Sequence, residues 1–533
     1  MMKRFFSLIS VFIALAITLA SCGPVGVDLP ESTEQTTIEN TTEAPGTEAP
    51  ETEAPGTETP GTETPGTETT GTETPGTETP GTETPGTETP RESEGLEFTS
   101  NGNGTCYVSG IGTCTDANII IPAVSPNGDR VTGIGSSAFY DCSDLTSITI
   151  PEGVKSIEKY AFFNCRGLIE INFNATAMND LAYNNYAFSY AGKYADGITV
   201  NIGANVTKIP AHLFNPHHSF SSEVPNVTSV VFEKGSECTS IGEYAFNYVK
   251  SLVSIAIPES VMIIGSHAFE GCYSLSGITI HDGVISIGSF AFKACSEIKS
   301  ITIPKSVVNV GTGAFSSCPG LERIEVESGN AEYYSIDNCL IETATKKLIV
   351  GCKNSVIPTD GSVTSIADSA FYGAAELTSI TIPNSVTYIG PCAFYGCKNL
   401  RGVIIPESVT SIGSYAFAGC ESITSINIPD NVTNIGDEAF NGCKGLTSVT
   451  IGNGVTKINA YTFQRCTALE SITIPDSVTS IGNSAFYDCS SLVTVNFGGS
   501  QEQWDSISKG KDWDKGIGDY TVTFQAKASD IDD

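Results

Sequence analysis

The strongest constraint on this chain is a repeat that covers most of its length. One unit runs from Leu145 to Cys165 and reads LTSITIPEGVKSIEKYAFFNC. Its phenylalanine recurs every 23 residues in two runs, and looser copies at spacings of 26, 26 and 32 lie within the first run. The repeated residues are Phe139, Phe162, Phe188, Phe214, Phe246, Phe269, Phe292, Phe315, Phe371, Phe394, Phe417, Phe440, Phe463 and Phe486. A fixed period of roughly 20 to 50 residues is typical of a solenoid, in which each unit packs on the next.

Each unit can be interpreted as three short segments. Ile148 and Ile150 alternate with polar residues, which indicates a half-buried strand, and Pro151 ends that strand because proline cannot donate to a β-ladder. Residues 154–157 form a second extended piece, and the Ala-Phe-x-x-Cys segment makes a tight helical turn. One unit cannot bury its apolar side alone, so we expect units to stack with their strands in parallel.

The segments L-T-S-I-T-I-P, V-T-S-I-G and A-F-x-x-C are nearly intact in Leu377–Cys397 and Leu469–Cys489. They resemble the BspA-type leucine-rich repeats of bacterial surface antigens, over roughly residues 97–525. We therefore predict a β-rich solenoid, a leucine-rich-repeat-like stack of about fourteen units of mostly 23 residues, capped at both ends. The resemblance also implies a protein associated with adhesion to host matrix proteins or to other bacteria.

The N-terminus has the features of an export signal. Residues 1–21 contain Lys3 and Arg4 followed by an apolar run, and residues 19–22 (LASC) resemble a bacterial lipobox. That resemblance implies that Cys22 carries a lipid and that the protein is exported and anchored at the bacterial cell surface. The alternative is an ordinary cleaved signal with an incidental cysteine.

Composition divides the rest of the chain. Residues 22–95 are dominated by Gly-Thr-Glu-Thr-Pro repeats with few apolar side chains, which predicts a disordered acidic stalk. Residues 96–130 lack the repeat signature and are interpreted as an N-terminal cap, in which a Cys106–Cys114 disulfide is left open. Residues 131–492 form the solenoid, and residues 493–533, with both tryptophans, form a C-terminal cap and tail.

The solenoid is irregular at residues 174–238 and 327–362. The first segment carries Tyr186 and Tyr190, which we expect on enlarged loops, either as a binding surface or as padding. It also holds His217 and His218, but no further ligand at a suitable spacing, so no metal is expected.

The second irregular segment reads as a hairpin that turns near Thr343 to Lys346 and either pads one turn or adds an edge ribbon. In that register Cys339 faces Val350 rather than Cys352, which argues against a Cys339–Cys352 disulfide.

Ten cysteines follow the repeated phenylalanine by three residues: Cys142, Cys165, Cys272, Cys295, Cys318, Cys397, Cys420, Cys443, Cys466 and Cys489. Stacked strands place equivalent Cβ atoms about 4.8 Å apart and pointing the same way. Disulfides need Cβ atoms about 3.5–4.5 Å apart with converging directions. We therefore predict free, buried thiols that pack as small apolar groups beside the phenylalanines. Cys392 occupies a position expected to face solvent and is the best candidate for a reactive thiol.

No catalytic motif or cofactor fingerprint is present, so we expect neither an enzyme nor a cofactor. The net charge of −33, without a basic stripe, argues against nucleic-acid binding. The oligomeric state is left open.

The leading prediction is a cell-surface protein that binds a host matrix protein, another surface protein or a glycan. In each unit the residue between the two core aliphatics of the first strand should point outward. The predicted contact residues are Thr149, Asn172, Thr279, Thr302, Glu325, Thr381, Asn427, Thr450 and Thr473, with Arg323, Tyr186 and Tyr190. The alternative is a passive spacer or coat protein, in which threonine serves only as a good strand former.

Overall fold

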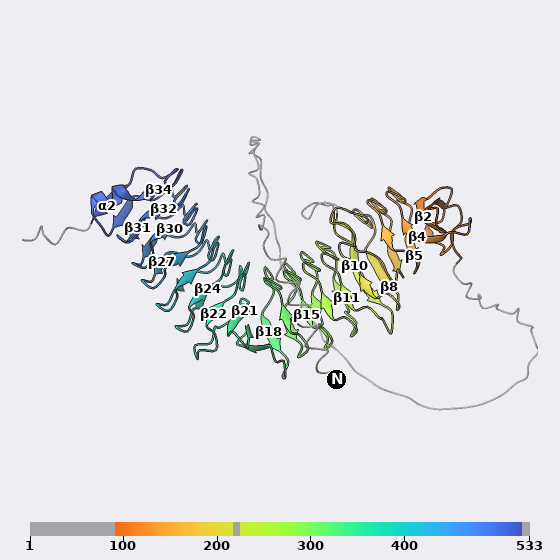
Figure 1. Ribbon diagram of the computed structural model, residues 1–533, viewed down its shortest axis with the longest axis horizontal. Coiled ribbons are helices and arrows are strands. Elements are labelled where there is room, and N and C mark those ends of the chain that lie inside the picture. The colour runs from red at the N-terminus through yellow and green to blue at the C-terminus, as the bar shows by residue number, and fades with distance from the viewer. Residues whose placement is uncertain (1–90, 217–223, 525–533) are drawn as a thin grey trace, which may run out of the picture. The chain divides into compact units, whose positions relative to one another are not determined.

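The computed structural model describes residues 91–216 and 224–524 (Figure 1). The chain divides into two units, Met1–Thr84 and Pro85–Asp533, and the fold described below belongs to the second. The predictions for the signal at 1–21, Cys22 and the stalk up to residue 90 lie outside the described residues, as do His217 and His218.

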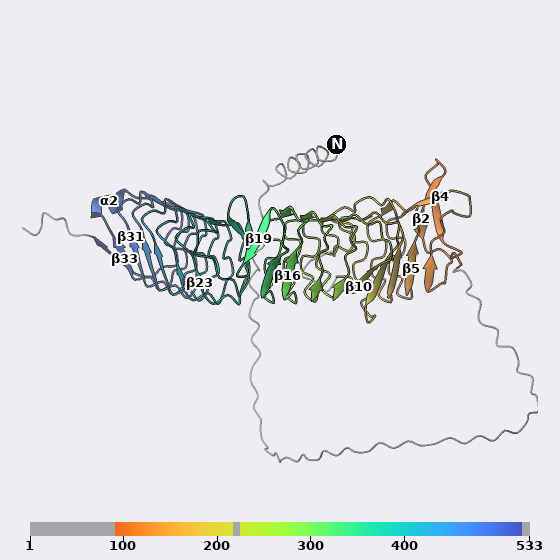
Figure 2. The ribbon, with the colours of Figure 1, turned by 90° about the horizontal axis from the view of Figure 1, so that it is seen from below.

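The second unit is a parallel β-solenoid of about 18 turns of ~23 residues. This confirms the predicted class, although the number of turns exceeds the fourteen expected from the repeated phenylalanine. Counting the repeated phenylalanine missed the turns that do not contain it. These turns lie before Phe139, within the 327–362 insertion and after Phe486. Each turn has two strand faces and a third, turn side formed by the Ala-Phe-x-x-Cys segment. Figure 2 shows the first-face strands along one long side of the stack.

The first face contains the strand that precedes the proline. Its strands are β3 (Asn118–Ile120), β5 (Ser147–Ile150), β7 (Glu170–Phe173), β8 (Ile198–Ile202), β10 (Val227–Phe232), β12 (Ser254–Ile255), β14 (Gly277–Ile278), β16 (Ser300–Ile303), β18 (Arg323–Val326), β23 (Ile380–Thr381), β25 (Val403–Ile404), β27 (Ser425–Ile428), β29 (Ser448–Ile451), β31 (Ser471–Ile474), β33 (Thr494–Phe497) and β35 (Thr521–Phe524). They form sheets of seven, two, two and five strands along the stack.

The second face contains the other strand of each turn. Its strands outside the insertion are β1 (Glu97–Ser100), β2 (Thr105–Gly110), β4 (Arg130–Ile134), β6 (Ser156–Ile157), β9 (Lys208–Ile209), β11 (Ser240–Ile241), β13 (Ile263–Ile264), β15 (Ser286–Ile287), β17 (Asn309–Val310), β22 (Ser365–Ile366), β24 (Tyr388–Ile389), β26 (Ser411–Ile412), β28 (Asn434–Ile435), β30 (Lys457–Ile458), β32 (Ser480–Ile481) and β34 (Ser508–Lys509). Except for β1, β2 and β4, these strands are two residues long. Only β1 is antiparallel to its neighbour among these strands.

The turn side carries its own hydrogen bonds. On the second face an N–H donates to the preceding turn, as Gly413 does to Ile389 O at 2.8 Å, whereas Phe417 N–H donates forward to Ala439 O at 2.8 Å. The phenylalanine rings stack in the core, with centroids 5.1 Å apart for Phe394 and Phe417. Backbone hydrogen bonds between neighbouring turns therefore occur on all three sides of the stack, although the first-face sheet is interrupted at three places.

The cysteines that follow the phenylalanines are free thiols. They are more than apolar fillers, because each buried thiol points at the carbonyl of the phenylalanine one turn back. Cys420 Sγ donates to Phe394 O at 3.2 Å, and Cys443 Sγ to Phe417 O at 3.2 Å. Cys142 departs from the prediction of burial, since it lies at the start of the row and is only half-buried.

The insertion is a three-stranded antiparallel element: β19 (Tyr333–Ile336), β20 (Cys339–Glu342) and β21 (Lys347–Val350), of which β21 pairs in parallel with β22. The turn between β20 and β21 lies where predicted, but a bulge shifts the register. Leu340, not Cys339, therefore pairs with Val350. β19 lies between two blocks of turns (Figure 2).

The β20–β21 hairpin is buried on both faces and is not an edge ribbon. We call the turns before the insertion the N-terminal block and those after it the C-terminal block. Leu340 and Val350 belong to the core of the N-terminal block. Cys339, Ile341 and Leu348 belong to the core of the C-terminal block. The hairpin is thus a wall between two hydrophobic cores.

Different structural elements lie at the two ends of the solenoid. At the N-terminal end Ser93 is buried and its N–H donates to Ile120 O at 2.9 Å, so the folded part begins before the predicted boundary at residue 96. Cys106 and Cys114 are both free. At the C-terminal end the helix α2 (Gln501–Ser506) starts with a capping box and packs its Trp504 against Phe497. No helix in the described part of the chain is long and apolar enough to cross a membrane.

Candidate functional site

The predicted outward residues form one row along the first face. The strand register pairs Thr302 with Glu325. Buried isoleucines flank Thr302, and Glu325 lies between the buried Ile324 and the half-buried Val326. The row comprises Thr149, Asn172, Thr279, Thr302, Glu325, Thr381, Asn427, Thr450 and Thr473, with Arg323 beside it. The structure brings these residues onto one surface, but their surroundings differ along the row.

The N-terminal part of the row is occupied by bonds among its own side chains. Asn201 Nδ2 donates to Asn172 Oδ1 at 2.9 Å and to Glu170 Oε1 at 2.9 Å. Asn172 Nδ2 lies 3.4 Å from Thr149 Oγ1, and these side chains are half-buried. Few donors or acceptors remain for a partner there.

The middle of the row carries charge and apolar surface. Arg323 Nη2 lies 2.6 Å from Glu325 Oε1, so these two charges pair with each other on one strand. Ile404 takes the place of threonine and is 78% exposed. This part offers an isolated apolar side chain rather than a polar array.

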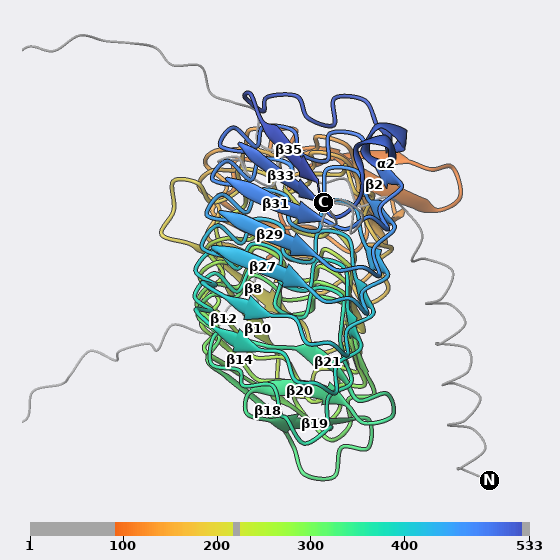
Figure 3. The same cartoon turned by 90° about the vertical axis from the view of Figure 1, so that its left-hand side faces the viewer.

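The C-terminal part of the row borders a groove. Strands β27, β29, β31, β33 and β35 run side by side in register (Figure 3). The groove, about 600 Å³ in volume, lies where these strands meet the following turns. It is lined by Asn427, Thr450 and Thr473 from the strands and by Glu407, Asp430, Asn453 and Asp476 from the turns.

The local sequence explains the position of these turn residues. Pro429 ends β27, and Val432 N–H donates to Pro429 O at 3.1 Å to close the turn. Asp430 Oδ1 accepts from Asn453 N at 2.8 Å and from Asn453 Nδ2 at 3.2 Å. Adjacent turns are thereby held at a fixed spacing, and both residues line the groove.

The groove is lined by groups that form hydrogen bonds. It combines hydroxyl, amide and carboxylate groups, and it contains no cysteine, histidine or lysine. Across residues 91–216 and 224–524, no three His, Cys, Asp or Glu side chains are placed to hold a metal ion. The arrangement can therefore exchange hydrogen bonds with a hydroxyl-rich ligand.

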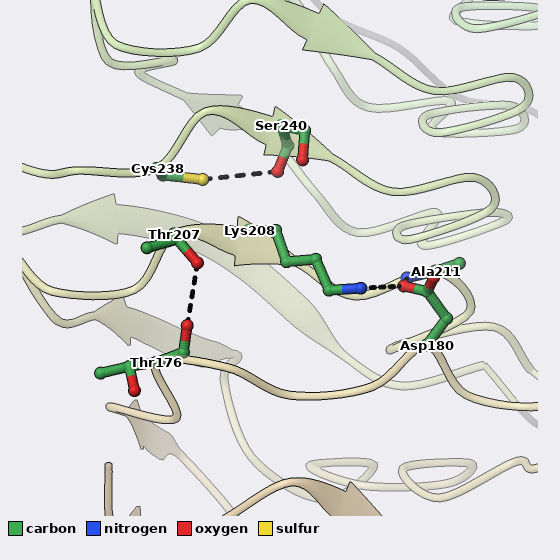
Figure 4. A network of polar contacts seen from close by, with 7 residues as sticks. All are labelled: Thr176, Asp180, Thr207, Lys208, Ala211, Cys238 and Ser240. Atoms are coloured by element: carbon green, nitrogen blue, oxygen red, sulfur yellow. Dashed lines mark hydrogen bonds and ion pairs between the residues drawn. The ribbon is translucent and has the colours of Figure 1, made fainter.

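The described parts of the first irregular segment, residues 174–216 and 224–238, keep the turn-to-turn pattern despite the greater length of these turns. Thr207 Oγ1 donates to Thr176 O at 2.9 Å, and Lys208 Nζ lies 2.9 Å from Asp180 Oδ1 (Figure 4). Partial burial alone would raise the pKa of Asp180, but the hydrogen bonds from Ala211 N–H and Lys208 outweigh it, so the pKa is lowered. This segment is a continuation of the stack.

The sequence predicted that Tyr186 and Tyr190 lie on enlarged loops, but they do not. They flank Phe188 on the turn side, with φ of 55° and 63°, at the positions that Tyr160 and Asn164 take one turn earlier. The predicted position of the two tyrosines was wrong because the insertions that lengthen these turns lie outside the segment around Phe188. The sequence analysis also did not predict that other aromatic residues gather on the turn side. Their fixed offset from the repeated phenylalanine could have indicated this position.

Cys392 is not the exposed thiol that was predicted. It is half-buried, with φ of 54° on the turn side. Burial raises its pKa to about 11, and Asp368 and Glu438 contribute in the same direction. At neutral pH the thiol is therefore protonated and a poor nucleophile.

A family model described as the BspA type leucine rich repeat region matches residues 118–222, 216–342 and 353–505. A leucine-rich cell surface protein of Faecalibacterium prausnitzii is 29% identical, with a TM-score of 0.53 over 79% of this chain and 98% of that one. The pneumococcal vaccine antigen PcpA is 19% identical, with a TM-score of 0.54 over 82% of this chain and 98% of that one, which shows the fold alone. No protein with a curated description matches.

Proposed function

Because this chain belongs to the BspA-type leucine-rich repeat family, whose solenoids are typically non-enzymatic binding scaffolds, we propose that it is an adhesin-like surface protein that binds a glycan. The groove beside the C-terminal part of the first face is the proposed site. The observation that carries the proposal is the convergence of Asn427, Thr450 and Thr473 with the turn carboxylates and amides around a space of about 600 Å³.

The lining favours a neutral, hydroxyl-rich ligand. Three carboxylates, from Glu407, Asp430 and Asp476, make the groove unfavourable for an anion. Carboxylates and amide oxygens accept from sugar hydroxyls, while Thr450 and Asn453 can donate to them. The row residues outside the groove are bonded to each other or stand alone, so they offer a glycan fewer hydrogen-bonding groups.

The test is a glycan array and a panel of matrix proteins probed with the purified protein. Thr450→Arg should fill the groove and lower the affinity for a glycan by roughly 10-fold or more. Thr302→Arg makes the same change on the same row outside the groove and should leave that affinity unchanged. Saturable binding to a matrix protein but to no glycan would move the proposal to a protein ligand. A folded protein that binds nothing would favour the passive spacer.

We further propose export and lipid anchoring through Cys22. The support is the lipobox resemblance of residues 19–22 together with the cell-surface relative. Cys22→Ser should abolish incorporation of radiolabelled fatty acid and release the protein from the membrane fraction. Labelling that persists in Cys22→Ser would refute the anchor and leave the groove proposal intact.

A further inference from the structure

A cluster of aromatic and basic side chains lies on the turn side of the N-terminal block, away from the groove. We call it the Arg166 cluster, and it consists of Tyr140, Phe163, Arg166, Tyr190, Lys193 and Tyr194. The rings are continuous, with centroids 5.2 Å apart for Tyr140 and Phe163 and 5.3 Å apart for Phe163 and Tyr190. Tyr140 and Tyr194 are 50% and 72% exposed, so the cluster presents ring surface to solvent.

Arg166 is held in place within this cluster. Its guanidinium lies 5.0 Å from the ring centroid of Tyr194 and 6.0 Å from that of Tyr190. Nε donates to Asn164 Oδ1, and Nη1 donates to the hydroxyl of Tyr194. Two of the five N–H groups are used, and three remain for a ligand.

The loop that carries Lys193 and Tyr194 is fixed to the preceding turn. Gly192 N–H donates to Cys165 O at 3.0 Å, and Tyr194 N–H donates to Arg166 O at 3.1 Å. Asn226 Nδ2 donates to Gly192 O at 3.2 Å and to the carbonyl of residue 195 at 3.0 Å. The basic groups are thus positioned before any ligand arrives, which lowers the entropic cost of binding.

The positive charges of the cluster are not neutralised by the protein. Neither Arg166 nor Lys193 forms an ion pair within the described ranges, whereas Lys208 and Lys293 pair with Asp180 and Glu270. Asp141 meets the cluster through Asn164, whose Nδ2 donates to Asp141 and whose Oδ1 accepts from Arg166. Two cations that gather against exposed tyrosine rings, on a chain with 60 acidic and 27 basic residues, point to a site for an external anion.

We propose that the Arg166 cluster binds a terminal acidic sugar, with its carboxylate on Arg166 and its ring on the exposed tyrosine faces. A guanidinium fork matches a planar carboxylate with two parallel hydrogen bonds. Lys193 Nζ, 4.8 Å from the Tyr190 ring centroid, adds a second cation beside the same surface. The apolar face of a sugar ring packs against an aromatic ring, which an acidic side chain of a peptide does not. The net charge of −33 disfavours a long polyanion and favours a single carboxylate.

The test compares 3′-sialyllactose and a glucuronic-acid-terminated oligosaccharide with neutral lactose, by calorimetry on the purified protein. The acidic sugars should bind roughly 10- to 100-fold more tightly than lactose, because a hydrogen-bonded charge pair is lost with the neutral sugar. The difference should shrink as NaCl rises, because the cluster is exposed. An acidic peptide and a heparin fragment serve as the other anionic probes.

Variants locate the site and separate it from the groove. Arg166→Gln and Lys193→Gln should each weaken binding of the acidic sugar, and Tyr194→Ala should do so without a change of charge. Arg465→Gln is the matched control, since Arg465 is an exposed arginine on the turn side of a distant repeat. Thermal unfolding establishes that each variant is folded, and Lys193→Gln remains decisive if Arg166→Gln is unstable.

The proposal is overturned if, in the Thr450→Arg variant whose groove is filled, lactose binds as tightly as the acidic sugars, or if neither acidic sugar binds. It is also overturned if the acidic peptide or heparin binds while the sugars do not, or if Arg465→Gln is as damaging as Lys193→Gln. Thr450→Arg should leave acidic-sugar binding unchanged, so failure of the groove proposal and failure of this one are distinguishable.

Discussion

The phenylalanine ladder makes a quantitative prediction at Phe417. Its side chain is 0% exposed, and its ring stacks on Phe394 at 5.1 Å and on Phe440 at 5.5 Å. Replacement of a buried phenylalanine by alanine costs roughly 3–5 kcal/mol, and each aromatic pair contributes about 0.5–1.5 kcal/mol beyond its buried area. Because Phe417→Ala removes both stacks, we expect the free energy of unfolding to fall by about 4–5 kcal/mol.

Urea unfolding followed by tryptophan fluorescence measures this loss. Trp504 lies in the same hydrophobic core as Phe417, and Trp513 packs against that core, so the signal reports the C-terminal block. Phe417→Leu keeps much of the buried volume and should lose less. Thr450→Ala, on the exposed row, should stay within about 0.5 kcal/mol. A loss below about 1 kcal/mol for Phe417→Ala, or equal losses for Thr450→Ala and Phe417→Ala, would refute the assignment of inward and outward positions.

Three further predictions concern single positions. Gly351→Ala would place a methyl group 2.1 Å from a ring carbon of a core phenylalanine, and should lower the free energy of unfolding by about 1–3 kcal/mol in the same assay. Cys392 should resist iodoacetamide at pH 8 and react only in urea, since its pKa is raised to about 11; fast labelling of the folded protein would contradict this. Burial alone would raise the pKa of Glu270, but His267 and Lys293 outweigh this effect, so the pKa is lowered. The stability that this carboxylate contributes is therefore present above its ordinary pKa and is lost as pH falls through the lowered value. Glu270→Gln should therefore flatten the acid side of the stability–pH curve, and an unchanged curve would show that the ion pairs do not matter.

The stacked fold was predictable because a single physical pattern repeats many times. Alternation around Ile148 and Ile150, a strand-ending proline and a fixed period leave few other ways to bury the apolar side of each unit. The outward row followed from the same alternation. These features depend on residues within one unit, which the sequence displays directly.

Features that depend on contacts between units were not predictable. The bulge that pairs Leu340 with Val350 lets the hairpin present apolar side chains to two different cores, and no local signal marks it. The groove requires the spacing of successive turns, which Asp430 and Asn453 set through a hydrogen bond between units. The Arg166 cluster combines a turn residue with a loop from the following unit, so its members are scattered in the sequence.

The wall formed by the β20–β21 hairpin has a consequence for how the gene can change length. Each repeat packs only on its neighbours, so a duplicated or deleted 23-residue unit alters one interface and preserves the rest. The hairpin meets the N-terminal core through Leu340 and Val350 and the C-terminal core through Ile341 and Leu348, so the two blocks can gain or lose units independently. Recombination within either block can therefore lengthen or shorten one block while the surface of the other is inherited unchanged.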